Sequence, residues 1–193
     1  FTGPNYEEGV DRSLSQKQFS HKVCRAEKLT AEKQNVNVER RPHRNFQQAL
    51  EEYEGGGDRK RIVDYLTAAA RDGNVEAMWR LGCAYDLGDH GLKKDEKAAV
   101  EMYRNAADGG SASAQFVLGL AYDAGDLGLQ KDEKTALEMY RNAANGGNED
   151  AQYKLSWAYH MGKFGLDVDE EKAFGLVQEA AKGGSSAAQD TIK

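Results

Sequence analysis

The chain has 193 residues, of which 30% are charged, and a formal net charge of −6 at pH 7. No apolar stretch approaches the roughly 20 residues of a membrane-spanning helix, so we expect a soluble protein. The acidic excess lies after residue 61, which disfavours nucleic acid as the main partner because contact with its backbone needs a basic surface.

The two cysteines, Cys24 and Cys83, lie too far apart in the sequence to indicate a disulfide framework or a metal site. We therefore expect a reducing compartment, either the cytoplasm or an organelle interior after removal of a targeting peptide. The chain starts at Phe1 without an apolar signal core, which we interpret as a processed or partial chain.

Residues 1–57 are predicted to form a non-repeat extension with one or two helices. Apolar residues at helical spacing predict a helix over about 15–33, and Pro42 suits the first turn of a second helix that runs to about Glu54. The extension has too few apolar residues for a core of its own. We expect it to lie along the repeats or along a neighbouring subunit and to become ordered on contact.

A basic cluster lies at the end of this extension, over Arg40–Arg44, with Arg59–Arg61 nearby. One interpretation is a solvated face, or one that pairs with the acidic repeats. The other is a docking site for an acidic protein or a membrane surface. The sequence leaves both open.

From residue 58 the sequence repeats with a period of 37 residues. The segments Ala77–Tyr85, Ala114–Tyr122 and Ala151–Tyr159 share Ala, Leu and Tyr at fixed offsets. Such a period is typical of a solenoid, in which each unit buries its apolar face against its neighbours. Each unit is predicted to hold a helix A, over about Val75–Leu87 in the first copy, followed by a helix B, over about 95–107.

Capping residues support this division. Asp95, Asp132 and Asp169 are placed to cap the B helices, and paired glycines are placed to end them. The predicted repeat region contains a half unit, three full units and the start of a further helix, over 58–73, 74–110, 111–147, 148–184 and 185–193.

These motifs resemble the Sel-1-like repeat family, which is related to the tetratricopeptide repeats. The family pattern A-x-x-x-L-G-x-x-Y is present in the first unit as Ala77, Leu81, Gly82 and Tyr85. The third unit departs from it, with Ser156 in place of the glycine. The resemblance implies an all-α fold, namely a right-handed α-α superhelix of such helix pairs. It also implies a non-enzymatic scaffold or adaptor, such as a subunit of a larger complex.

Positions that are constant between the units are expected to serve packing, so partner contacts are expected where the units differ. On helix A these positions lie at i, i+3 and i+7, on one face. The resemblance places helix A on the concave side of the superhelix. The alternative is that some of these residues fill space between adjacent helices. The predicted partner-binding residues are Arg80, Leu87, Val117, Leu120, Ala124, Lys154, Trp157 and Met161.

No catalytic site, metal site or cofactor site is predicted. The histidines are scattered, His90 is expected to be a solvated loop residue, and Cys83 is expected to be a small packing residue. We therefore expect other proteins as partners. The alternatives are a peptide or small-ligand receptor and an enzyme-like member of the family that binds cell-wall precursors or β-lactams. The last group typically carries a cysteine pair in each repeat, which this chain lacks.

Overall fold

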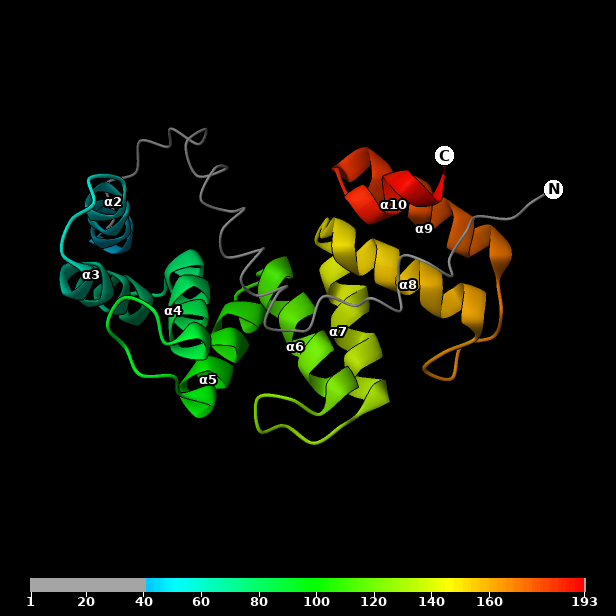
Figure 1. Cartoon of the computed structure of the whole chain (residues 1–193), viewed down its shortest axis with the longest axis horizontal. Coiled ribbons are helices and arrows are strands. Elements are labelled where there is room, and N and C mark those ends of the chain that lie inside the picture. Colours follow the sequence, from blue (N-terminus) through cyan, green and yellow to red (C-terminus); the bar gives the residue numbers. More distant parts are fainter. Residues whose placement is uncertain (1–40, 193) are drawn as a thin grey trace. The chain divides into compact units, whose positions relative to one another are not determined.

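The structure is a computed structural model that describes residues 41–192, so the expected helix over 15–33 lies outside the described residues. The described part is helical throughout and contains no strand, which confirms the all-α class. Its helices, labelled in Figure 1, are α2 (Arg41–Glu54), α3 (Arg59–Arg71), α4 (Val75–Leu87), α5 (Glu96–Asp108), α6 (Ala112–Ala124), α7 (Glu133–Asn145), α8 (Glu149–Met161), α9 (Glu170–Gly183) and α10 (Ser186–Thr191).

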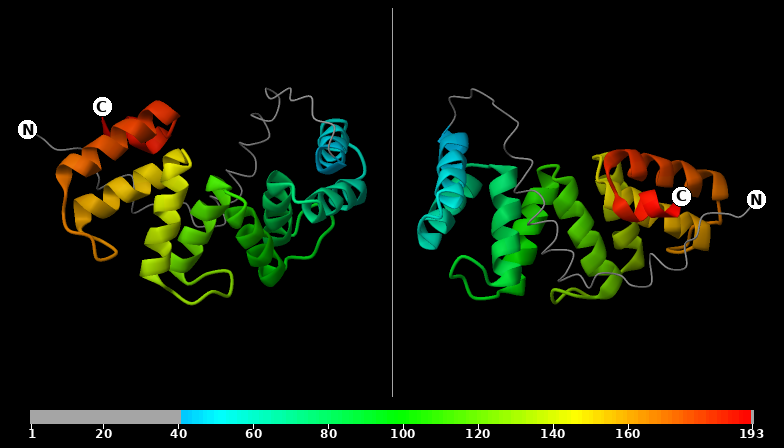
Figure 2. Two further views of the ribbon diagram at one scale, coloured as in Figure 1. Left: turned by 180° about the vertical axis from the view of Figure 1, so that it is seen from behind. Right: turned by 45° about the horizontal axis from the view of Figure 1, so that its top comes forward.

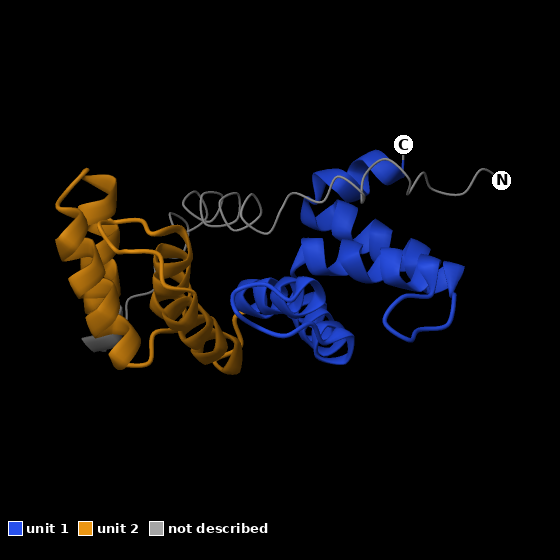
Figure 3. Ribbon diagram, turned by 60° about the horizontal axis from the view of Figure 1, so that its bottom comes forward, with its two compact units in different colours: residues 1–16, 112–193 blue, residues 17–111 orange. Residues whose placement is uncertain are grey.

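The chain divides into two compact units, whose described parts are residues 41–111 and 112–192 (Figure 3). The first unit contains the helix pairs α2–α3 and α4–α5. The second contains α6–α7 and α8–α9, followed by the short α10. In each pair the two helices lie side by side and are joined by one loop (Figures 1 and 2).

Helix α2 is the packing partner of α3. Phe46, Ala49 and Tyr53 of α2 lie in one apolar cluster with Ile62 and Leu66 of α3. The half unit expected from residue 58 therefore has a complete partner helix, contributed by the end of the extension. The 37-residue pattern does not reveal this helix because its sequence lacks the repeat motif.

The helix ends form where the sequence predicts them. Asp95, Asp132 and Asp169 each precede a B helix in an extended conformation, and each side chain accepts a backbone N–H of the first helical turn. The first two B helices end at a glycine pair. The second glycine of each pair has a positive φ, which is 91° for Gly110 and 85° for Gly147. The predicted caps and helix ends are confirmed.

The constant small residues allow the two helices of a pair to approach closely. Gly82 lies against the ring of Tyr103, and a Cβ atom there would lie 2.5 Å from the ring. Gly119 lies against Tyr140 in the same way, with a corresponding distance of 2.8 Å. Both tyrosines are fully buried. A larger residue on helix A would therefore push the two helices apart.

The third pair changes both members of this contact. Ser156 stands where the other A helices have glycine, and Val177 stands where the other B helices have tyrosine. Both side chains are fully buried, and the Ser156 hydroxyl donates a hydrogen bond of 2.7 Å to the carbonyl of Tyr153. A larger residue on helix A is thus matched by a smaller one on helix B.

The loops between helices A and B share an unusual backbone conformation. His90, Leu127 and Phe164 occupy the same repeat position and have φ angles of 53°, 55° and 57°, which are uncommon for residues other than glycine. Each side chain packs inward: Leu127 is 5% exposed, and the Phe164 ring centroid lies 5.8 Å from that of Tyr140. The loop therefore carries a ring or an aliphatic side chain back onto the preceding helices.

Candidate functional site

Most of the variable helix-A positions of the second unit reach the surface. Leu120, Lys154 and Trp157 are partly exposed, Ala124 is exposed, and Met161 is 50% exposed. These five residues lie on α6 and α8, and we call them the helix-A surface. The constant alanines and leucines of the same two helices are buried, with Ala114 and Ala151 at 0% and Leu118 and Leu155 at 2% and 4%, and the constant Tyr122 and Tyr159 are partly exposed.

Val117 is an exception and corrects the prediction. Its side chain is fully buried, so it cannot contact a partner in this structure. The equivalent residues, Arg80 and Lys154, are partly exposed. A long basic side chain at this position extends its charged end to solvent, whereas the short valine side chain stays in the core.

Arg80 and Leu87 belong to α4, in the first unit. Both are partly exposed. The Arg80 guanidinium pairs with Glu76 at 2.7 Å and lies 5.7 Å from the centre of the Phe46 ring. Arg80 is therefore held against α2 and α4, and Leu87 lies at the end of α4.

Lys154 is at the centre of a charged and aromatic cluster that joins α6, α7 and α8. Its Nζ lies 3.1 Å from Oδ2 of Asp123, and the same oxygen accepts a hydrogen bond of 3.2 Å from the hydroxyl of Tyr140. Burial, together with the Asp123 charge and this hydrogen bond, raises the pKa of Tyr140, so the phenol stays protonated and donates. The ammonium also lies 5.4 Å from the centre of the Trp157 ring.

Trp157 has two roles in this arrangement. It packs against the buried cluster of Tyr153, Val177, Ala180 and Ala188, and it remains partly exposed. The alternative interpretation of the variable positions, in which such residues fill space between helices, therefore applies to part of the Trp157 ring. The residue is nevertheless not fully buried, and Lys154 lies over its ring.

The histidine predicted to be solvated is packed. The ring centroid of His90 lies 5.6 Å from that of Tyr53 in an edge-on arrangement, and only 17% of the His90 side chain is exposed. The solvated interpretation is therefore wrong, because the repeated loop conformation turns this position inward. His160, at the end of α8, pairs through Nδ1 with Glu170 at 2.9 Å.

Cys83 is 5% exposed, as expected of a small packing residue. It is also disulfide-bonded, so the expectation that the cysteines form no disulfide is wrong. Cys24, the other cysteine of the chain, lies outside the described residues. The expected reducing compartment depended on the absence of a disulfide and loses that support.

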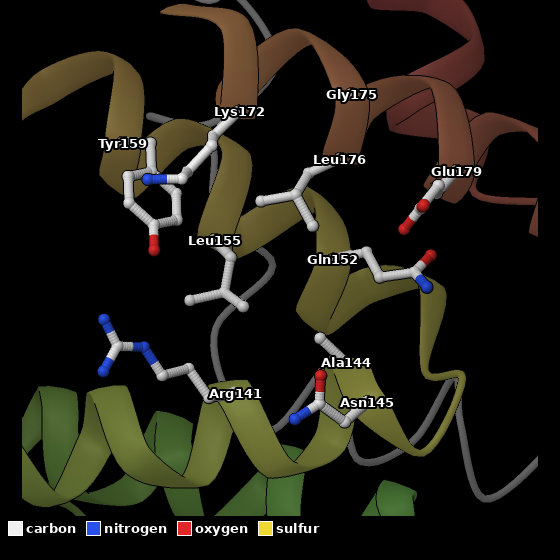
Figure 4. A pocket seen from close by; sticks show the side chains of 10 residues that line it. All are labelled: Arg141, Ala144, Asn145, Gln152, Leu155, Tyr159, Lys172, Gly175, Leu176 and Glu179. Atoms are coloured by element: carbon white, nitrogen blue, oxygen red, sulfur yellow. The ribbon is translucent and has the colours of Figure 1, made fainter. Parts of the chain in front are cut away.

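A hollow lies on the side of α8 that faces away from the helix-A surface, and the differences between the A helices did not reveal it. This hollow has a volume of about 450 Å³ and lies between α7, α8 and α9 (Figure 4). Its residues on α8 include Leu155 and Tyr159, which are offset by two positions, or about 200° around the helix, from Trp157 and Met161. The signal that could have revealed the hollow is Gly175, which stands where the other B helices have glutamate.

Within residues 41–192, no group of three His, Cys, Asp or Glu side chains is placed to hold a metal ion. The same part of the chain contains no helix with the length and apolar character needed to cross a membrane.

Comparisons with known proteins agree with this geometry. The sequence model of the Sel1 repeat matches the chain three times, over residues 75–111, 112–148 and 149–185, which together make up more than half of it. A comparison with curated proteins gave no match.

Solved structures with the same fold include a Sel1 repeat protein from Oxalobacter formigenes, with 36% identity and a TM-score of 0.60 over 64% of this chain and 91% of that one. Another is c5321, a protective antigen present in uropathogenic Escherichia coli strains that displays an SLR fold. It has 29% identity and a TM-score of 0.68 over 77% of this chain, which spans only 32% of that one. Helicobacter pylori cysteine rich protein B, with 21% identity, a TM-score of 0.51 and coverage of 66% and 95%, shows likeness of fold alone.

Proposed function

The chain belongs to the Sel1 repeat family, whose members are generally non-enzymatic scaffolds that bind other proteins, and we propose that it is an adaptor that holds partner polypeptides on the helix-A surface. Such an adaptor would act as a subunit of a larger assembly. The N-terminal extension is a second predicted contact, and its residues before Arg41 lie outside the described range.

One observation carries the proposal. On α6 and α8, the alanines and leucines that are constant between repeats are buried, whereas the helix-A surface combines a half-exposed methionine, a partly exposed tryptophan and a positioned lysine. Tryptophan and methionine are enriched at protein interfaces. Lys154 is held by Asp123 and by two aromatic rings, so a partner would bind an ordered side chain and lose little side-chain entropy.

Two substitutions test the surface without removing a buried group. Leu120→Asp and Met161→Asp together place two charges in the apolar part of the helix-A surface. The full chain serves as bait for affinity capture followed by mass spectrometry, and the affinity for each captured protein is then measured. We expect the double variant to bind a specific partner at least about tenfold more weakly, because two apolar contacts become desolvated charges.

The matched control is Gln130→Asp with Asn142→Asp, which adds the same charge at exposed positions of the same unit. It should capture the partner as the unmodified chain does. Equal capture by the surface variant, with unchanged helicity by circular dichroism, would show that the helix-A surface is not the binding site.

A further inference from the structure

We propose that the hollow between α7, α8 and α9 is a second binding site, which takes an extended peptide segment carrying an acidic side chain (Figure 4). It lies away from the helix-A surface and does not depend on it. The argument rests on three features that meet in the hollow: a pair of cations, an apolar floor and two side-chain amides.

The cations are Arg141 of α7 and Lys172 of α9, on the same side of the hollow (Figure 4). Lys172 is anchored by Asp169 at 2.8 Å, and its Nζ lies 5.4 Å from the centre of the Tyr159 ring. The hydrogen bond to Asp169 raises the pKa of Lys172, and the charge of Arg141 acts in the opposite direction. The guanidinium of Arg141 makes no hydrogen bond or ion pair with another described residue. A carboxylate between the two cations would relieve their repulsion and occupy these donors.

The floor of the hollow is apolar, and one of the residues that line it is a glycine. Leu155 and Leu176 lie in the middle of the hollow, next to Gly175 (Figure 4). A Cβ atom on Gly175 would meet no atom within 4 Å, so no packing contact in the structure requires glycine. Glycine in the interior of a helix is less favourable than alanine, because it loses more backbone freedom on folding. The first two full repeats carry Glu101 and Glu138 at the position of Gly175.

The opposite side of the hollow carries the amides of Asn145 and Gln152, with Glu179 beside them (Figure 4). An amide side chain both donates and accepts, so it can pair with the N–H and C=O groups of an extended main chain. Glu179 repels a second acidic group at this end. The charges therefore favour one direction of a bound segment, with its acidic residue toward Arg141 and Lys172.

The test starts from a phage library of random octapeptides, selected on the full chain. Enriched peptides are then synthesised, and their binding is measured by fluorescence anisotropy. We expect enrichment of Asp or Glu at one position, and replacing that residue with its amide should weaken binding at least about tenfold. Arg141→Glu should weaken binding to a similar extent. Gly175→Glu should do the same, because it places in the hollow the residue that the other repeats carry there.

Two controls separate this site from the helix-A surface. Lys97→Glu makes the same charge change on an exposed residue of α5 and should alter binding less than twofold. The Leu120→Asp, Met161→Asp variant should also keep its affinity for the peptides. The proposal is overturned if no peptide is enriched, if enriched peptides lack an acidic residue, or if Arg141→Glu binds as tightly as the unmodified chain. Loss of peptide binding in the helix-A variant alone would overturn it too, while supporting the proposed function.

Discussion

At the scale of single residues, the third repeat shows that departures from a repeat motif can be coupled. Ser156 and Val177 are separate exceptions in the sequence, 21 positions apart. In the structure they occupy the two sides of the contact that Gly119 and Tyr140 form in the preceding pair. Each change is therefore acceptable because the other is present.

Val177→Tyr alone should lower the free energy of unfolding by about 1–3 kcal/mol, because the ring would meet the Ser156 side chain. Adding Ser156→Gly should recover part of this loss. Recovery stays partial because His160 stands where Asp123 accepts the Tyr140 hydroxyl. Urea unfolding of the two single variants and the double variant measures the coupling.

Gly119→Ala is the reference variant, because it creates the same kind of overlap by enlarging the residue on helix A. Its Cβ atom would lie 2.8 Å from the Tyr140 ring. Additive effects of Ser156→Gly and Val177→Tyr would show that the two positions are independent.

At the predicted partner-binding positions, the structure tests exposure and not binding. Differences between repeats select a face of helix A, and most of its residues are at the surface in the second compact unit. The differences between repeats could not show that Val117 is buried whereas Lys154, at the same repeat position, is partly exposed. Exposure at this position depends on the length of the side chain. They also could not show that His90 is packed, because this follows from a loop conformation in which a residue other than glycine has a positive φ.

At the scale of helices, the capping aspartates were predicted because their signal is local. Asp132 accepts the hydroxyl of Thr135 at 2.7 Å and the backbone N–H groups of Lys134 and Thr135. Helix α2 was predicted as a helix from its apolar spacing and from Pro42. Its pairing with α3 could not be predicted, because Arg44 and Gln48 stand where the repeat motif has leucine and tyrosine.

The cap of α7 should make stability depend on pH in the acid range. The hydroxyl of Thr135, followed by its backbone N–H, lowers the pKa of Asp132 in the folded state. The contribution of the cap is therefore present above about pH 4, the usual pKa of an unfolded aspartate, and is lost as the pH falls through the lower, folded value.

Asparagine caps helices about as well as aspartate but does not titrate. Asp132→Asn should therefore show a smaller fall in Tm between pH 5 and pH 3 than the unmodified chain, measured by circular dichroism. Asp132→Ala should have the lower Tm at pH 7. Identical pH profiles for the asparagine variant and the unmodified chain would remove Asp132 from the acid response.

At the scale of the whole molecule, the described part consists of helix pairs that contact mainly their neighbours in sequence. Such arrays are stabilised by each repeat and by its adjoining interfaces, so damage to one repeat can stay local. The sequence predicted this organisation well because the repeat is a global signal. The division into two units was not predicted, because the sequence joint between Ser111 and Ala112 resembles the other joints between repeats.

Leu155→Ala removes a side chain that is 4% exposed in α8 and should cost about 2–5 kcal/mol. Hydrogen exchange followed by mass spectrometry should then show faster exchange in α8, α9 and α10, with little change in α3 and α4. Leu66 is buried in α3. Leu66→Ala should therefore give faster exchange in α3 and α4, with little change in α8, α9 and α10. Uniformly faster exchange in either variant would indicate that the described helices unfold as one cooperative body.

The loops that join helices A and B also limit how the chain can change in length. In all three, the backbone N–H of the capping aspartate bonds to the carbonyl of the tyrosine ten residues earlier, as between Asp95 and Tyr85 at 2.9 Å. The left-handed position between them directs one side chain into the preceding helices. A single inserted residue would break this geometry, whereas an insertion of 37 residues would reproduce it. The array can therefore be lengthened or shortened by gene duplication in whole repeats, and an engineered chain should gain binding surface in the same steps.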